Sequence, residues 1–220
     1  MTFAIKGKSQ FLLSLIKERK YHLKNKIKKI IFIHSSDGPE IKQLRSHLEQ
    51  EEDQVDAHFT KKVPEDLASL IEPECTLICI DDKELHFSSK ENWQQLYNLA
   101  SFTVHHRMAH CFFTIQSVAA LKKDSVLNRS VSQSSHMVYF RNQHDARSMR
   151  THLSNYSSLQ LMGGQSLFEL YQKYVQRARF MYIIVNISAK ARVNSVYSNI
   201  LLDSPGFMMA FHDDSENESD

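Results

Sequence analysis

The chain has 220 residues, of which 42% are hydrophobic, and its 27 Lys and Arg nearly balance 25 Asp and Glu to give a formal net charge of +2. This composition is sufficient for a hydrophobic core and excludes a disordered chain. It also excludes a global basic field, so any contact with nucleic acid must be local.

Cysteine content and hydropathy indicate a soluble, intracellular protein. Three cysteines, Cys75, Cys79 and Cys111, are too few for a disulfide framework, which favours a reducing compartment. No apolar run reaches the ~18 residues that span a bilayer, and the first residues lack the features of a signal peptide. We therefore expect no membrane partner.

Short apolar runs that end in turn or polar residues predict buried strands. They lie at 30–33, 76–80, 111–115, 136–140 and 180–186. Apolar residues at helical spacing predict helices before and between these strands. These follow Ser9 and cover 40–50, 63–70, a segment that includes Trp93 to Leu99, 145–153 and 166–177.

The alternation of strands and helices predicts an α/β domain whose mainly parallel sheet is covered by helices on both faces. No internal repeat and no linker divide the chain, so residues 1–203 are expected to form one domain. Residues 204–220 end in DDSENESD and are expected to be a disordered acidic tail. A basic run at 17–29 and an acidic run at 49–56 are interpreted as solvated faces.

The predicted strand at 76–80 runs directly into Asp81 and Asp82. In an open parallel sheet, ligands bind at the carboxyl ends of the strands, where a carboxylate can reach a magnesium ion that bridges phosphates. A second acid beside it can polarise the attacking water. The alternative, a strand that simply ends in a polar turn, explains the two acids equally well at this point.

Gly7, Lys8 and Ser9 precede an amphipathic run, as in a phosphate-binding loop that enters its helix. In such a loop the lysine neutralises the β- and γ-phosphates, the serine hydroxyl ligates magnesium, and the helix N-terminus supplies unpaired N–H groups. The full pattern is G-x-x-x-x-G-K-[ST], and Thr2 stands where its first glycine belongs. The strand that leads into such a loop is missing, unless residues 2–5 form a short substitute.

Two more polar residues have places that suit phosphate chemistry. Gln116 comes at the end of the predicted strand 111–115, where an amide can orient the attacking water or sense the γ-phosphate. Arg107 lies upstream and is a candidate arginine finger that contacts the nucleotide of a neighbouring subunit.

The histidines around this arginine raise the question of a zinc site. They are His105, His106 and His110, followed by Cys111. These residues contain no paired ligand set with the spacing of known zinc sites. We therefore do not expect zinc.

Four stretches carry a resemblance to a known family. They are LICIDD, TVHHRMAHCFFTIQS, LNRSVSQSSHMVYFRNQHDARSMRTHL and ARFMYIIVNISAKARVNSVYSNIL. In this order they resemble the genome-packaging ATPases of the FtsK/HerA superfamily, and within it the poxvirus-like packaging ATPases of Polinton (Maverick) elements and adintoviruses. The resemblance extends from Gly7 to Ile200.

This resemblance implies a P-loop NTPase-like domain of the RecA or FtsK/HerA type, with its first strand missing or shortened. It assigns a Walker A remnant to Gly7, Lys8 and Ser9, the magnesium-side acid to Asp81, the catalytic acid to Asp82 and the polar sensor to Gln116. Ser117 stands where the family usually has Asn. Asn142 and Asp145 match a turn and helix cap that follow the family's fourth strand.

The resemblance also implies an ATP-driven DNA packaging or translocation ATPase that uses ATP and Mg²⁺. Its partners would be double-stranded DNA, further copies in a homo-oligomeric ring and viral capsid proteins, in a virion or at a nuclear or cytoplasmic site of assembly. Lys122, Lys123 and residues 141–150 are candidates for contacts with DNA phosphates.

Two alternatives to this function stay open. One is a catalytically inactive P-loop-like remnant that acts as an interaction or DNA-binding module. The other is a small-molecule P-loop kinase, which is disfavoured because the sequence contains no lid segment with several arginines.

Overall fold

The structure is a computed structural model. The residues that it describes are 6–23, 25–35, 37–51, 54–89, 91–118, 121, 125–131, 136–140, 146–154, 166–175, 182–186, 194–198 and 208–211. The chain divides into two compact units: the parallel-sheet unit comprises Lys8–Gln116 and Lys122–Gln133, and the antiparallel-sheet unit comprises Met1–Gly7, Ser117–Leu121 and Ser134–Asp220. Sequence analysis predicts one domain over 1–203, and the two units are described separately below.

The parallel-sheet unit contains a four-stranded sheet in the order β2-β1-β3-β4. Its strands are β1 (Lys29–Ile33), β2 (Asp56–Thr60), β3 (Thr76–Ile80) and β4 (His110–Phe113). All neighbouring pairs are parallel: Ile33 lies beside Thr60 and Ile80, and Ile80 lies beside Phe113. The carboxyl ends of the four strands therefore meet at one edge. The prediction of an α/β fold with a parallel sheet is confirmed for this unit.

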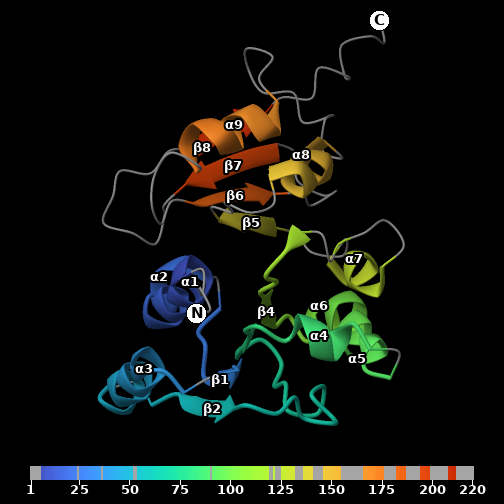
Figure 1. Ribbon diagram of the computed structural model, residues 1–220. Coiled ribbons are helices and arrows are strands. Elements are labelled where there is room, and N and C mark those ends of the chain that lie inside the picture. The colour runs from blue at the N-terminus through green and yellow to red at the C-terminus, as the bar shows by residue number, and fades with distance from the viewer. Residues whose placement is uncertain are drawn as a thin grey trace, which may run out of the picture. The chain divides into compact units, whose positions relative to one another are not determined.

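The core of the unit is formed by β1 and β3, which are the central strands. Residues Ile30 to Ile33 and Leu77 to Ile80 are all 0% exposed. In Figure 1, α1 (Lys6–Lys17), α2 (Arg19–His22) and α3 (Pro39–Glu49) lie on one side of the sheet, and α4 (Glu84–Phe87), α5 (Trp93–Asn98) and α6 (Val104–His106) lie on the other. A π-helical turn, Leu99–Thr103, joins α5 to α6, and α7 (Val126–Val131) packs against α5. Helices therefore cover both faces, as the sequence predicts.

The two longest helices of this unit, α1 and α3, each bury one apolar stripe. Leu12, Leu15 and Ile16 of α1 are buried at helical spacing, and α3 has Pro39 at its first position, where proline is well tolerated. Both helices are close to their predicted positions. No described helix of the chain has the length and hydrophobicity needed to cross a membrane.

Two sequence expectations for this unit differ from the structure. Residues 63–70, predicted as a short helix, contain no helix, and 65–70 form turns instead. There the Ser69 N–H and hydroxyl bond the Asp66 side chain and carbonyl, local contacts that compete with a helix. The sequence also misses β2, because its residues DAHFT contain no apolar run and lie at the edge of the sheet.

The antiparallel-sheet unit contains a second four-stranded sheet, in the order β5-β6-β7-β8. Its elements are β5 (His136–Phe140), α8 (Ala146–Ser154), α9 (Leu167–Tyr174), β6 (Tyr182–Asn186), β7 (Asn194–Ser198) and β8 (Met208–Phe211). All neighbouring strands are antiparallel. The expectation that strands 136–140 and 180–186 join one mainly parallel sheet is therefore wrong. A buried apolar run has the same pattern in either direction, so it predicts a strand but not its partner.

The strand β8 lies inside 204–220, the segment expected to be a disordered tail. It pairs with β7, with Met208 beside Tyr197 and Phe211 beside Asn194. These four residues are thus part of a sheet. Residues 212–220, which include DDSENESD, lie outside the described residues.

Candidate functional site

The candidate site lies at the carboxyl edge of the parallel sheet, where β3 and β4 end. Helix α1 begins at Lys6, so Lys8 and Ser9 lie in its first turn, directly after Gly7. Both side chains bond groups that follow strands: Lys8 bonds the Ile115 carbonyl and Ser9 bonds Asp81. The first turn of a helix carries unpaired N–H groups and a partial positive charge, so this turn suits an anion.

Asp81 is the first residue after β3 and is only 9% exposed. Its carboxylate oxygens accept hydrogen bonds from two hydroxyls, Oδ2 from Ser9 Oγ at 2.7 Å and Oδ1 from Thr114 Oγ1 at 2.6 Å. Its N–H donates to the Ile33 carbonyl at 2.7 Å. A buried carboxylate needs such partners, because an unpaired buried charge is strongly destabilising. Ser9 and Asp81, the two expected magnesium-side groups, are therefore in direct contact.

Asp82 adopts a left-handed backbone conformation, with φ of 61°. Its N–H donates to Thr114 Oγ1 at 3.1 Å, its carbonyl accepts from Ser35 Oγ at 2.9 Å, and its Oδ1 accepts from Gln116 Nε2 at 2.5 Å. Asp tolerates this conformation better than most residues, but it is still strained. A strained backbone conformation that several hydrogen bonds hold in place is typical of functional sites.

Gln116, the predicted sensor, is held between two acids. Its side-chain amide donates to Asp82, and its backbone N–H donates to Glu84 Oε2 at 2.6 Å. Glu84 is the first residue of the short helix α4. The structure therefore brings Gln116 and Asp82 together and adds a third carboxylate next to them.

Lys8 lies near these carboxylates but bonds a neutral group. Its Nζ donates to the Ile115 carbonyl at 2.6 Å. Burial lowers the pKa of Lys8 below its ordinary value, and the negative charges of Asp82, Glu84 and Asp81 oppose this only in part. A half-buried ammonium of this kind is stabilised when an anion binds beside it.

Sequence reasoning finds Lys8, Ser9, Asp81, Asp82 and Gln116 but misses three residues of the site. The missed residues are Ser35, Glu84 and Thr114. Ser35 bonds Asp82, and Glu84 bonds Gln116. Thr114 bonds both Asp81 and Asp82. The available signal was position, because Ser35 and Thr114 come within two residues of the ends of β1 and β4. A hydroxyl residue just after the carboxyl end of a parallel strand is therefore as good a candidate for a binding site as an acid is.

The oxygen groups of the site fit magnesium. Ser9 Oγ and Asp81 Oδ2 are hard ligands 2.7 Å apart, and magnesium is usually held by one or two protein oxygens together with water and phosphate oxygens. In the part of the chain that the structure describes, no group of three or more His, Cys, Asp or Glu is arranged to hold a metal. The residues present thus fit a magnesium ion that binds together with phosphate.

Arg107 lies at the other end of the sheet. Its guanidinium donates to the Ile71 carbonyl, and its own carbonyl accepts from the Glu74 N–H at 2.7 Å. Both partners precede β3. Within one chain, the structure does not bring Arg107 to Asp81 and Asp82. Its contact with a neighbouring subunit's nucleotide stays a prediction.

Several sequence candidates lie outside the described residues. They are residues 2–5, Lys122, Lys123 and 141–145, which include Asn142 and Asp145. Of the candidate DNA segment 141–150, Arg147 and Arg150 lie exposed on α8. The Arg150 guanidinium lies 5.7 Å from the centre of the Phe168 ring, a cation–π contact within its own unit.

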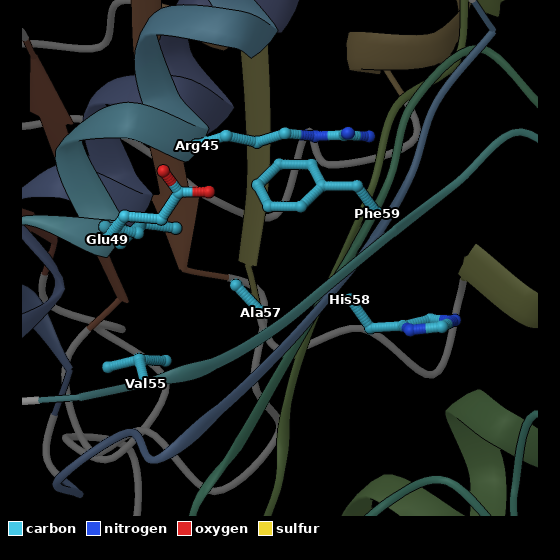
Figure 2. A pocket seen from close by; sticks show the side chains of 7 residues that line it. Arg45, Glu49, Val55, Ala57, His58 and Phe59 are labelled. Carbon is cyan, nitrogen blue, oxygen red and sulfur yellow. The ribbon is translucent and has the colours of Figure 1, made fainter.

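A separate cavity of about 390 Å³ is lined by residues of α3 and β2 and of the segment between them (Figure 2). In Figure 2, the Arg45 guanidinium lies over the Phe59 ring, 4.8 Å from its centre. Arg45 and Glu49 bring opposite charges to this cavity, so it favours neither anions nor cations. It shares no lining residue with the site at the carboxyl edge.

No family model matches the chain, and no curated protein or solved structure matches it. What bears on function is therefore the chemistry of the carboxyl edge. An ammonium, a pair of hydroxyls, two consecutive acids and an amide meet there within hydrogen-bond distance of one another or of neighbouring strand ends.

Proposed function

We propose that the parallel-sheet unit binds ATP together with Mg²⁺ and hydrolyses it, as P-loop NTPases do. The observation that carries this proposal is the 2.7 Å hydrogen bond from Ser9 Oγ to Asp81 Oδ2. It joins a hydroxyl in the first turn of a helix to a carboxylate directly after a buried strand, across 72 positions of sequence. A phosphate-binding loop and the acid after a buried strand contribute these two oxygens to magnesium.

Lys8 and the first turn of α1 supply positive charge for the phosphates. Gly7 is the second residue of this turn, whose backbone N–H groups can donate to phosphate oxygens. Lys8 donates to the neutral Ile115 carbonyl, which a phosphate oxygen can replace as acceptor. A charge-assisted hydrogen bond is about twice as strong as a neutral one, so this exchange favours binding.

Asp82 and Gln116 are suited to handle the attacking water. Their side chains are 2.5 Å apart, and the backbone of each is held in place, Asp82 by Thr114 and Gln116 by Glu84. A carboxylate can take a proton from water as general base, and an amide can orient the same water. We assign these two roles to Asp82 and Gln116.

The sequence stretches LICIDD and TVHHRMAHCFFTIQS favour one class among such enzymes. By their resemblance we propose a viral-type DNA packaging or translocation ATPase, in which copies of the chain form a ring around double-stranded DNA and a capsid receives the DNA. In such a ring, Arg107 of one subunit would contact the nucleotide of the next. The support for the DNA, the ring and the capsid is this resemblance.

Binding of a fluorescent ATP analogue in the presence of Mg²⁺ tests the nucleotide site. Lys8→Ala should weaken binding by about 10-fold to 100-fold, because a hydrogen bond to a charged group contributes about 1.5–3 kcal/mol. The matched control is Lys28→Ala, which removes an exposed lysine just before β1 at the opposite edge. Lys28→Ala should bind like the wild type. Equal binding by wild type and Lys8→Ala would contradict the proposed site.

Hydrolysis assays with and without double-stranded DNA test the finer proposal. Hydrolysis stimulated by DNA, with stimulation that falls steeply as salt rises, is expected of a translocase. Stimulation that is absent at low salt would contradict the DNA-dependent class and leave the nucleotide site standing. A chain that binds DNA or a protein partner but neither binds nor hydrolyses ATP would instead be the inactive module.

A further inference from the structure

We propose that Thr114 is a positioning residue that couples the metal-side acid to the water-side acid. One hydroxyl bonds both: Thr114 Oγ1 donates to Asp81 Oδ1 at 2.6 Å and accepts from the Asp82 N–H at 3.1 Å. The inference rests on the proposed nucleotide function and assigns a role to a residue that the sequence pattern does not reveal.

A hydroxyl is the group that can make both contacts at once. It has one donor hydrogen and two acceptor lone pairs, so it can give a hydrogen bond to a carboxylate and receive one from an amide. Among side chains of this size, Ser and Thr offer that combination. Valine has the shape of threonine but offers neither contact.

The backbone of Thr114 is held where the hydroxyl can reach both acids. Its N–H donates to the Ile80 carbonyl at 2.9 Å, which continues the pairing of Ile80 with Phe113 beyond the end of β4. Ile80 is the residue just before Asp81. The register of β3 and β4 therefore places Thr114 next to Asp81.

Two consequences follow for the acids. With Oδ1 bonded to Thr114, Asp81 keeps Oδ2, the oxygen that Ser9 also contacts, as the one that would hold a metal ion. The bond to the Asp82 N–H also stabilises the left-handed backbone that brings the Asp82 carboxylate to Gln116. One residue thereby sets the metal oxygen and the orientation of the general base together.

The other end of β3 supplies a matched control. Thr76 is 0% exposed, and its Oγ1 donates to the Glu72 carbonyl at 2.9 Å and accepts from the Glu72 N–H at 2.8 Å. Thr76→Val and Thr114→Val therefore each remove one donated and one accepted hydrogen bond of a threonine hydroxyl, at the first residue of β3 and just after β4 respectively. Only Thr114 touches the acids of the site.

The experiment measures the Mg²⁺ concentration that half-saturates binding of the fluorescent ATP analogue, for the full chain and for Thr114→Val, Thr114→Ser and Thr76→Val. Loss of an outer contact that orients a metal ligand typically costs 10-fold to 100-fold in metal affinity, so Thr114→Val should raise the half-saturating concentration by about that factor. Thr114→Ser keeps the hydroxyl and should stay close to wild type. Thr76→Val should lower thermal stability without changing the Mg²⁺ dependence.

A second readout needs neither nucleotide nor metal. Hydrogen exchange of the Asp82 amide, followed by NMR, should be faster in Thr114→Val than in the wild type and unchanged in Thr76→Val and Thr114→Ser. This measures the Thr114–Asp82 bond directly.

The possible outcomes separate the inference from the function on which it rests. If the wild type binds the Mg-nucleotide and folded Thr114→Val shows the same Mg²⁺ dependence, Thr114 has no positioning role and the proposed function stands. If Thr76→Val shifts the Mg²⁺ dependence as much as Thr114→Val, the effect is general loosening and the inference is wrong. If the wild type binds no Mg-nucleotide, the proposed function and the inference both fail.

Discussion

Two acidic residues stand at the two ends of β3 in the same backbone conformation but in different surroundings. Glu74 precedes the strand and Asp82 follows it, with φ of 62° and 61°. Glu74 is exposed, and its N–H donates to the Arg107 carbonyl at 2.7 Å. Asp82 is anchored through its N–H, its carbonyl and its carboxylate to three other side chains. The left-handed conformation thus closes a loop at Glu74 and orients a carboxylate at Asp82.

Two ion pairs lie near the amino edge of the sheet. Arg19 bonds both carboxylate oxygens of Glu51, and Lys29 lies 2.9 Å from Glu72. These pairs neutralise part of the basic run at 17–29 within the chain, so fewer of its charges are available to nucleic acid. Paired charges of this kind serve the fold.

The three charged groups of the candidate site at the carboxyl edge have neutral partners instead, although Lys61 and Asp37 form an ion pair at 2.6 Å after β2 and β1. The carboxylates of Asp81 and Asp82 are held by hydroxyls and amides, and Lys8 bonds a backbone carbonyl. Neutral dipoles hold each group in place without cancelling its charge, which leaves it able to act on a charged ligand. The contrast between these ion pairs and the three site residues indicates that the bonding partners of a charged side chain are a better guide to its role than its burial.

Replacement of each acid by asparagine gives the largest expected effect. Asparagine tolerates the left-handed conformation, so both variants should fold. Asp82→Asn should lower the rate of ATP hydrolysis by about 10²-fold to 10⁴-fold, because it removes the general base, while Mg-ATP still binds. Glu74→Asn should hydrolyse ATP at the wild-type rate, since Glu74 lies at the opposite end of β3.

Single-turnover hydrolysis with saturating Mg-ATP measures this effect without interference from binding or product release. Similar rates for wild type and Asp82→Asn would show that Asp82 is not the base. A loss of rate in Glu74→Asn as large as in Asp82→Asn would mean that the loss reflects general damage to the fold and not removal of a general base.

The Arg19–Glu51 pair gives the next largest effect, on stability. Arg19 is 1% exposed, and its guanidinium donates to Glu51 at 3.1 and 2.5 Å. Glu51→Ala should lower the free energy of unfolding by about 3 kcal/mol, because it leaves a buried cation without its partner. Urea denaturation measures this, and nucleotide binding by the folded protein should not change. Glu49→Ala removes an exposed acid at the end of α3 and should cost less than about 0.5 kcal/mol.

The same pair predicts the sign of a pH effect. The hydrogen bond from Arg19 lowers the pKa of Glu51 below its ordinary value, despite its partial burial. Because the folded-state pKa is depressed, this stabilisation is present above the ordinary Glu range and is lost as the pH falls through the lowered pKa. Acidification should therefore destabilise the wild type more than Glu51→Ala. The same loss of stability in both proteins would show that the ion pair contributes nothing.

The acids and the helix start are predictable from sequence because local pattern determines them. Asp81 and Asp82 follow an apolar run that is too short for a buried helix, and Ser9 precedes apolar residues at helical spacing. Parallel pairing of the strands brings their carboxyl ends to one edge of the sheet, and this is enough to bring the acids and the start of the helix together.

The remaining parts depend on which strands are neighbours, which no local pattern records. Thr114 reaches Asp81 only because Ile80 lies beside Phe113 in the sheet. The edge strand β2 has no apolar run to reveal it, and the apolar run of β6 is the same whether its partner is parallel or antiparallel. Sequence pattern thus predicts which residues lie at strand ends but not which of them touch.

The smallest expected effect concerns the left-handed backbone of the two acids. A residue with a Cβ in this conformation is strained by about 1–2 kcal/mol, and glycine is not. The greater freedom of glycine in the unfolded chain cancels part of this gain. Glu74→Gly should therefore raise the free energy of unfolding by about 0.5–1 kcal/mol and the melting temperature by about 1–4 °C, with unchanged hydrolysis.

Asp82→Gly should gain less stability than Glu74→Gly, because it also removes the carboxylate that accepts from Gln116 Nε2. It should abolish most hydrolysis, for the reason given for Asp82→Asn. Thermal unfolding of the two glycine variants side by side measures the difference. If Glu74→Gly is instead less stable than the wild type, the strain at the amino end is compensated by contacts of the Glu74 side chain. The side chains of Glu74 and Asp82 would then both stabilise the fold, and only Asp82 would also serve hydrolysis.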